Sequence, residues 1–256
     1  MHLTIGVTGH RDLVDDEIPA LKEKVREFFR QLKAEFPHLD LQLITPLAEG
    51  SDRLVADIAL EMGISLIVPL PMAQADYERD FISPAAIDTF RDSLNSARVI
   101  NLRMVPEAEG QPMTEVVRDR QYAQLGIFVS NHSHILLALW DGKASDATGG
   151  TSSVVNYHLT GVMPGYSVVD DSPNLLAENE NDLVYHVACS RERPGGQLRE
   201  DVQPSQAAWI TAHWGYERGD VMPLDYRVAL HRLQDYELDT KKYRTAIESQ
   251  GADLLE

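Results

Sequence analysis

The sequence predicts an α/β fold, a doubly wound and mostly parallel sheet with helices on both faces. Short apolar segments of strand length alternate along the chain with longer segments whose apolar residues recur at helical spacing. In addition, Ile64–Leu70 and Ile135–Trp140 are apolar at nearly every position, which is typical of strands that are buried on both faces of a sheet.

The first half of the chain alternates strands and helices. Leu3–Thr8 is the first expected strand, and Asp15 or Asp16 can cap a helix that runs to about Glu35. The apolar positions of this helix recur at helical spacing. The elements expected next are a strand at Leu41–Thr45, a helix at Ser51–Met62, a strand at Ile64–Leu70, a helix near Pro84–Asn95 and a strand at Arg98–Leu102.

The second half continues the alternation and then changes character. The expected elements are a helix at Thr114–Asn131, a strand at Ile135–Trp140, a helix at Thr151–Leu159 and a further strand at Leu183–Ala188. We therefore assign residues 3–190 to one α/β domain. Residues 191–223 are polar with proline and glycine at first and are expected to form an irregular excursion, and residues 224–256 a C-terminal helical segment.

Composition and charge restrict the class of partner. The 256 residues include 43% hydrophobic and 25% charged residues, which is ordinary for a globular protein. The formal net charge is −17, from 23 Lys and Arg against 40 Asp and Glu. This acidity disfavours a nucleic-acid polymer or an anionic membrane surface as a partner. A small anion is still compatible, because local arginines and helix N-termini can override the global field.

A single cysteine, Cys189, excludes an intrachain disulfide and a cysteine-based metal site within one chain. The sequence begins directly with a strand, without the basic and apolar regions of a leader, and its apolar runs are too short to span a bilayer. We expect a cytoplasmic protein that makes no membrane contact and uses no metal or cofactor.

Three unusual segments follow predicted strands, at the edge where open parallel sheets bind ligands. The first is Thr8-Gly9-His10-Arg11. Gly9 permits close backbone approach, and Arg11 offers a fixed fork of donors for a phosphate or carboxylate. The alternative is a tight turn with an exposed arginine.

The second segment is Pro46–Arg53, between a strand and its helix. Gly50 and Ser51 at the helix start make N–H groups available to an anion, although Ser51 is equally an ordinary N-cap. Glu49 places a negative charge where a phosphate would sit. It can bind ribose hydroxyls, act as an acid or base, or pair with a neighbouring arginine.

The third segment is Trp140-Asp141-Gly142, followed by Gly149-Gly150-Thr151-Ser152. Two glycines before a helix that starts with threonine form a phosphate cradle of backbone donors and a hydroxyl. Asp141 ends a buried strand, where a carboxylate binds sugar hydroxyls or caps a loop. All three segments are expected on the same edge of one sheet.

Taken together, these segments resemble the SLOG superfamily of Rossmann-like domains. The resemblance rests on Gly9-His10-Arg11, Ala48–Leu54, Leu137–Gly142 and Gly149-Gly150-Thr151, and covers roughly residues 3–160. The superfamily includes the Lonely Guy phosphoribohydrolases, which activate cytokinins, and the DNA-processing SMF proteins. It also includes nucleotide-sensing domains of bacterial conflict systems and of some TRP channels.

The resemblance implies a site for a nucleotide or nucleotide-derived ligand. The residues that would form it are Gly9, His10 and Arg11 in the first loop, Gly50, Ser51 and Arg53 in the second, and Asp141, Gly149, Gly150 and Thr151 in the third. The enzymatic branch has a Pro-Gly-Gly-x-Gly-Thr segment followed by a glutamate that cleaves the N-glycosidic bond. Here Ser152-Ser153-Val154-Val155 follows Thr151, without a carboxylate.

Three functional hypotheses follow. The first is a sensor that binds a small nucleotide and regulates an attached or partner effector, as a homodimer like other members of the superfamily. The alternative is an enzyme that cleaves a nucleotide N-glycosidic bond, with Glu49 or Asp141 as its working carboxylate. The third is a scaffold whose pocket is vestigial.

Overall fold

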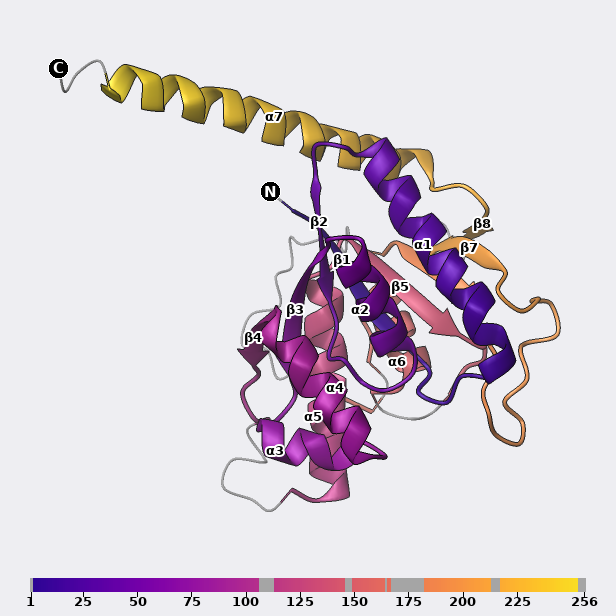
Figure 1. Cartoon of the computed structure of the whole chain (residues 1–256). Helices are drawn as coiled ribbons and strands as arrows, with labels where there is room; N and C mark the ends of the chain where they lie inside the picture. The colour runs from indigo at the N-terminus through magenta and orange to yellow at the C-terminus, as the bar shows by residue number, and fades with distance from the viewer. Residues whose placement is uncertain are drawn as a thin grey trace.

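An eight-stranded α/β sheet with helices on both faces forms the protein, which confirms the predicted fold class (Figure 1). The computed structural model describes residues 2–105, 113–145, 149–163, 165–166, 182–212 and 217–252. Its strands are β1 (His2–Gly9), β2 (Asp40–Ile44), β3 (Ser65–Leu70), β4 (Ala97–Asn101), β5 (Ile135–Trp140), β6 (Val184–Ala188), β7 (Ala207–Thr211) and β8 (Glu217–Gly219).

The strand order is β4-β3-β2-β1-β5-β6-β7-β8. The pairs from β4 to β6 are parallel, whereas β7 is antiparallel to both β6 and β8. From β1 the chain moves outward through β2, β3 and β4, and then returns to the other side of β1 as β5. The fold is thus Rossmann-like, and the carboxyl ends of β1 and β5 form its topological switch point.

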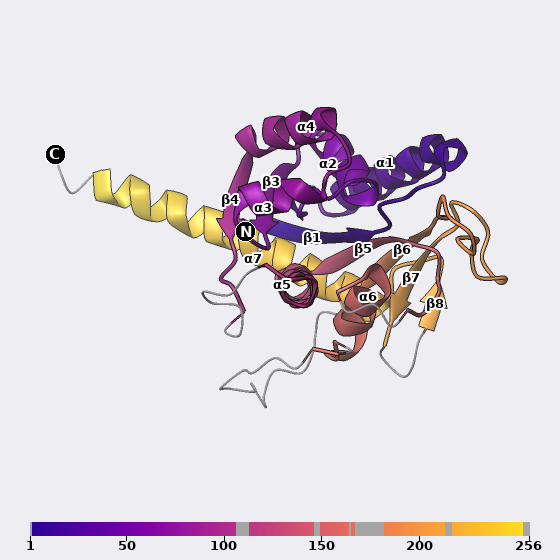
Figure 2. The ribbon, with the colours of Figure 1, turned by 90° about the horizontal axis from the view of Figure 1, so that it is seen from below.

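Helices cover the two faces of the sheet (Figure 2). The helices are α1 (Ile18–Glu35), α2 (Ser51–Glu61), α3 (Gln74–Tyr77), α4 (Pro84–Asn95), α5 (Glu115–Asn131), α6 (Thr151–Thr160) and α7 (Leu224–Ala252), with short 3-10 turns at Asp15–Glu17 and Glu78–Asp80. Helices α1, α2 and α4 lie on one face, and α5 and α6 lie on the other. This two-sided cover explains why the central strands carry nearly continuous apolar runs.

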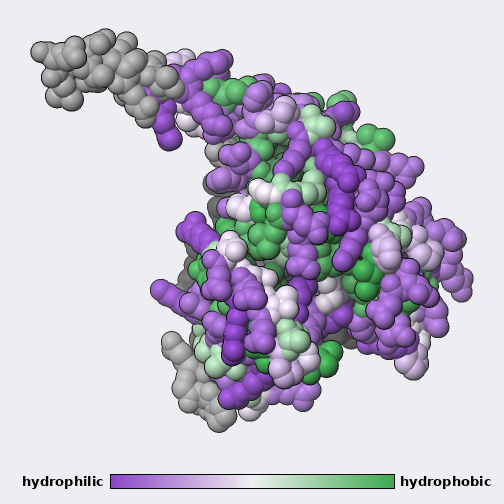
Figure 3. All heavy atoms as spheres, in the orientation of Figure 1, coloured by the Kyte–Doolittle hydropathy of each residue, from purple (hydrophilic) through white to green (hydrophobic). Residues whose placement is uncertain are grey.

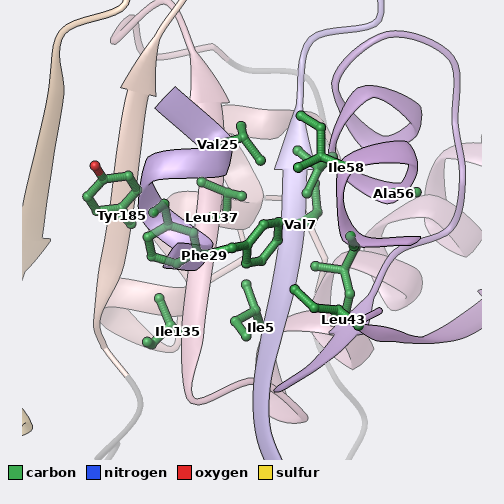
Figure 4. Packing of buried hydrophobic residues seen from close by; sticks show 14 of the residues in the cluster. Ile5, Val7, Val25, Phe29, Leu43, Ala56, Ile58, Ile135, Leu137 and Tyr185 are labelled. Carbon is green, nitrogen blue, oxygen red and sulfur yellow. The ribbon is translucent and has the colours of Figure 1, made fainter. Parts of the chain in front are cut away.

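The core under α1 shows how the predicted helical periodicity is used (Figure 4). Val25 and Phe29 of α1 are fully buried and face Ile5 and Val7 of β1 and Leu137 of β5. The neighbouring face of α1 extends along the same face of the sheet to β6. There the Phe28 ring stacks on Tyr185 with centroids 4.5 Å apart. One helix therefore buries apolar side chains against both halves of the sheet.

The stretch 191–223 differs from its predicted irregular structure. Residues 191–206 form a loop, but Ala207–Thr211 and Glu217–Gly219 extend the sheet as strands β7 and β8. These strands are only five and three residues long, too short for periodicity to distinguish a strand from a helix or a loop. Their pairing covers the edge of β6, which would otherwise expose unpaired backbone groups.

The C-terminal segment is helical, and its first half packs on the body of the protein. The ring of His231 lies 4.9 Å from that of Phe36, and the side-chain oxygen of Gln234 accepts a hydrogen bond of 3.1 Å from the His38 amide. Arg227 also pairs with Glu35 at the end of α1. The second half of α7 extends away from the body (Figures 1 and 2).

The molecular face in Figure 3 is mostly hydrophilic, with apolar side chains visible between the elements. Among the described residues, no helix combines the length and the hydrophobicity needed to cross a bilayer.

Candidate functional site

A cavity of about 460 Å³ lies at the carboxyl ends of β1 and β5, at the switch point of the sheet. Its walls come from the loop after β1, the loop after β2, helix α5, the start of α6 and the loop after β6. The volume lies within the range of small-ligand sites. The predicted residues that line it are Gly9, His10, Arg11, Asp141, Gly149, Gly150 and Thr151.

The loop after β1 places its histidine inward and its arginine at the mouth of the cavity. The Nε2 atom of His10 lies 3.0 Å from the backbone nitrogen of Asp141 and 3.3 Å from its Oδ1. Arg11 is exposed, and its guanidinium carbon lies 5.5 Å from the ring centre of Tyr122, a cation–π distance. The arginine is thereby held at the cavity without a carboxylate in direct contact with it among the described ion pairs.

Asp141 is buried, and its carboxylate stabilises the third loop. Its Oδ1 accepts a hydrogen bond of 3.0 Å from the Lys143 amide, and His10 lies against the same oxygen. Burial alone would raise the pKa of Asp141, but the hydrogen bonds from His10 and from the Lys143 amide outweigh it and lower that pKa. A carboxyl group that stays ionised cannot serve as a general acid near neutral pH.

The two glycines of the third segment have different roles. Gly149 has a φ of +74°, and a Cβ there would lie 2.7 Å from the backbone nitrogen of Ala123 in α5, so this glycine allows close packing. Gly150 is the N-cap residue of α6, and Thr151 begins the helix. The positive end of the α6 dipole consequently faces the cavity.

The second predicted loop supports the first one and does not line the cavity with its glycine, serine or arginine. Both the amide and the hydroxyl of Ser51 donate to the carbonyl of His10, at 3.0 and 2.8 Å. A Cβ on Gly50, whose φ is +81°, would lie 2.3 Å from the Arg11 carbonyl oxygen, and one on Gly9 would lie 2.3 Å from the Ser51 Cβ. The loops after β1 and β2 are therefore interlocked. Both hydrogen-bond donors of Ser51 are already engaged by the His10 carbonyl and are not available to a ligand.

Arg53 and Glu49 also point away from the cavity, toward the start of α4. An Nη2 donor of Arg53 bonds the Ala86 carbonyl at 2.6 Å, its guanidinium lies 5.1 Å from the Phe81 ring centre, and burial lowers its pKa. The carboxylate of Glu49 accepts from the Ile82 amide at 3.2 and 3.3 Å. Neither side chain lies among the residues that line the cavity.

Three cationic residues of the cavity wall were not singled out in the sequence. Arg191 and Arg193 come from the loop after β6, and Lys143 follows β5. The Nε of Arg191 bonds Asp12 at 2.8 Å, and Lys143 donates to the Gly195 carbonyl at 3.2 Å. The signal was an Arg-x-Arg-Pro-Gly-Gly run directly after a predicted strand, the same location that identified the other segments.

Asp52 lies buried at the base of α2, behind the first loop. Burial raises its pKa to about 7, against the opposing effects of Arg11 and of a hydrogen bond from the Ala48 backbone. A carboxyl group that titrates near neutral pH next to a cavity is typical of functional sites, although it also occurs at structural ones.

Comparison with known proteins gives structural likenesses only. No family model matches the sequence, and no curated protein matches it. DNA processing protein A from Streptococcus pneumoniae is similar in structure, with 14% identity, a TM-score of 0.38, and coverage of 60% of this chain and 45% of that one. DNA processing protein A from Helicobacter pylori, studied for its single-stranded DNA binding mode, is also similar in structure. It has 14% identity, a TM-score of 0.36, and coverage of 56% of each chain.

Two predictions from the sequence differ from what these two proteins are described as doing. The predicted ligand was a small nucleotide, and a nucleic-acid polymer was excluded as a partner, whereas both similar structures are DNA-processing proteins and the second binds single-stranded DNA. The exclusion rested on the net charge of −17, which averages over the whole surface and does not describe one cavity. This chain spans about half the length of each similar structure.

Proposed function

We propose that this chain binds single-stranded DNA at the carboxyl edge of its sheet, with backbone phosphates along the cationic wall of the cavity. We also propose that it is a SLOG-type domain, on the three motifs described above. The single observation that carries the DNA proposal is the charge of the cavity wall.

That wall is positive in a strongly acidic chain. Its charged side chains are four cations and one carboxylate, namely Arg11, Lys143, Arg191, Arg193 and Asp141. The carboxylate already accepts a hydrogen bond from the Lys143 amide. Asp12, beside the wall, pairs with Arg191 and lies 4.0 Å from Arg193, which still leaves an excess of positive charge. A cavity with excess positive charge attracts phosphate groups even when the whole molecule repels them.

The positions of the cations suit several phosphates of a DNA strand better than a single phosphate. They follow β1, β5 and β6, which are adjacent in the sheet, so the strand ends carrying them span roughly 10 Å. Tyr122 and Trp140 also line the cavity. Proteins that bind single strands combine a basic groove with aromatic side chains on which bases stack.

The test compares two arginines with matched exposure. Arg193 at the cavity is 55% exposed, and its Nε lies 4.0 Å from Asp12, whereas Arg30 on α1 is 56% exposed and pairs with Glu23. Binding of a labelled oligothymidylate is measured by fluorescence anisotropy over a series of salt concentrations. We expect R193A to weaken binding and to reduce the log–log salt slope by about 0.7, the value for one lost phosphate contact on a single strand.

The control variant R30A removes the same charge and should leave both quantities unchanged. Equal effects of R193A and R30A would mean that binding follows net charge alone, which would refute the cavity as the site. Absence of binding by the unchanged protein at low salt would refute the function itself.

A further inference from the structure

Two arginines form a cluster beside the cavity and outside it. Arg218 is an exposed residue of the edge strand β8, and Arg199 lies in the loop between β6 and β7. Neither residue lines the cavity. Arg218 pairs in register with Ile210 of β7, which pairs with Val184 of β6 (Figure 2). Side chains alternate along a strand, so Arg218 and His186 lie on the same face of the sheet.

The buried ring of His186 shows that the two arginines lie close together. Its Nε2 donates a hydrogen bond of 2.8 Å to the Trp140 carbonyl. Burial, together with the charges of Arg218 and Arg199, lowers the pKa of His186 to about 4. Both guanidinium groups are thus near enough to act on one imidazole. Since this imidazole is neutral near pH 7, the positive charge of the cluster comes from its arginines.

The charge of Arg199 is balanced, whereas that of Arg218 is not. Arg199 makes a bidentate pair with Asp201, with 2.8 Å between Nη2 and Oδ2. In the described part of the chain, no carboxylate forms an ion pair with Arg218. Desolvation and the charge of Arg199 lower the pKa of Arg218, against the opposing effects of Asp201 and Asp220. Arg218 still stays charged, so a bound anion would stabilise it.

Trp140 connects this cluster to the cavity. Its ring lines the cavity and lies 5.5 Å from the ring of His186. Arg199 reaches the loop after β5, where its Nη1 lies 3.5 Å from the Gly142 carbonyl oxygen. Arg218 is three strands from β5, about 14 Å across the sheet. One phosphate cannot bridge that distance, but the backbone of a nucleic-acid strand can.

We propose that Arg218 and Arg199 form a second phosphate subsite, which binds the backbone of a DNA strand that leaves the cavity past Trp140. The inference rests on the proposed DNA binding and adds the direction in which the strand leaves, toward β8. Trp140 is half-buried between the two subsites and offers a ring on which a base stacks. Arg199 can exchange Asp201 for a phosphate, because such an exposed ion pair contributes little.

The test compares two labelled oligothymidylates by fluorescence anisotropy with the full chain. One is the shortest whose binding responds to R193A, and the other has about 16 nucleotides. R218A should weaken binding of the longer one about threefold, the value of one exposed ion pair, and lower its log–log salt slope by about 0.7. The shorter one fills the cavity alone, so R218A should bind it as the unchanged protein does.

R98A is the matched control, since Arg98 is an exposed arginine of β4, the strand at the opposite edge of the sheet. It removes the same charge and should leave the ratio of the two dissociation constants unchanged. D201N supplies a change of opposite sign, because it releases Arg199. It should tighten binding of the longer oligothymidylate about threefold relative to the shorter one, a gain that misfolding would not produce.

The outcomes separate this inference from the proposed function. If neither oligothymidylate binds the unchanged protein, the proposed function fails and the second subsite fails with it. If R193A weakens binding at both lengths but R218A has the same effect as R98A, the cavity remains the binding site and the second subsite is refuted. A ratio of dissociation constants that D201N leaves unchanged would overturn the role of Arg199.

Discussion

Glycines hold the loops of the cavity in place, because the absence of a Cβ lets the loops pack against each other. Gly50 has a φ of +81° and a ψ of −121°, a conformation open to glycine and strained for other residues. It also lies against the Arg11 carbonyl, with no space for a Cβ. The same contact fixes the backbone that carries Arg11 into the cavity wall.

We predict that G50A destabilises the protein by about 3 kcal/mol or more, because backbone strain and a backbone clash add together. Gly63 is the control, since it has a φ of +68° but, among the described residues beyond its chain neighbours, nothing within 4 Å of where a Cβ would lie. G63A should cost about 1 kcal/mol, from backbone strain alone. Urea unfolding of both variants measures the difference, and equal losses would show that the interlock contributes nothing.

A second prediction concerns Asp52, whose pKa of about 7 exceeds its ordinary value of 3.8. The folded protein then holds a proton that the unfolded chain releases, so this group's contribution to stability is complete below about pH 3.8 and is lost as the pH rises to about 7. The loss is about 4 kcal/mol at most. D52N should remove this pH-dependent contribution from the free energy of unfolding.

The measurement is the free energy of unfolding at about pH 5 and about pH 8, for the unchanged protein and for D52N. The difference between the two pH values should be smaller in the variant. D92N, which alters an exposed carboxylate of α4, should retain the profile of the unchanged protein. An identical profile in D52N would show that Asp52 is ionised throughout.

At the scale of elements, α1 joins the two halves of the sheet. Phe28 is fully buried and contacts Tyr185 of β6 and, with ring centres 6.0 Å apart, Trp209 of β7. F28A should therefore destabilise the protein by about 3–5 kcal/mol in urea unfolding. The control I82A shortens a side chain that is 90% exposed and should change stability by less than about 0.5 kcal/mol.

Elements with strong periodicity could be predicted, and elements without it could not. The apolar repeat of α1 and the continuous run of β5 identify both from the sequence alone. Strand β7 is the five-residue segment Ala207–Thr211, too short for periodicity to identify it as a strand, and its place follows from pairing with β6. Tertiary pairing of this kind leaves no local signal.

The candidate site was predictable to the same extent. Arg11 and Gly149 could be assigned to the cavity because they follow strands at the switch point. The sequence does not show that Ser51 would direct its donors to the His10 carbonyl, or that Arg53 would turn to Ala86. These hydrogen-bond partners depend on which loop lies nearest in the folded structure.

At the scale of the whole molecule, charge is distributed unevenly. The chain carries a net charge of −17, yet a positive cavity wall is built where the loops after three adjacent strands converge. The acidic remainder repels polyanions at long range, and this repulsion is screened by salt. The proposed binding of DNA at the cavity would therefore depend on two opposing electrostatic effects, and the variant R193A separates the local effect from the global one.

The interlock of the first two loops also determines where this protein can change. Gly9 and Gly50 admit no larger side chain without displacing backbone or a buried serine, so variation there lowers the stability of the fold. The loops at 143–145 and 191–195 form a neighbouring part of the wall, where Lys143 bonds the Gly195 carbonyl, and most of their residues are exposed. A combinatorial library confined to these two loops would alter the ligand while the inherited scaffold stays intact.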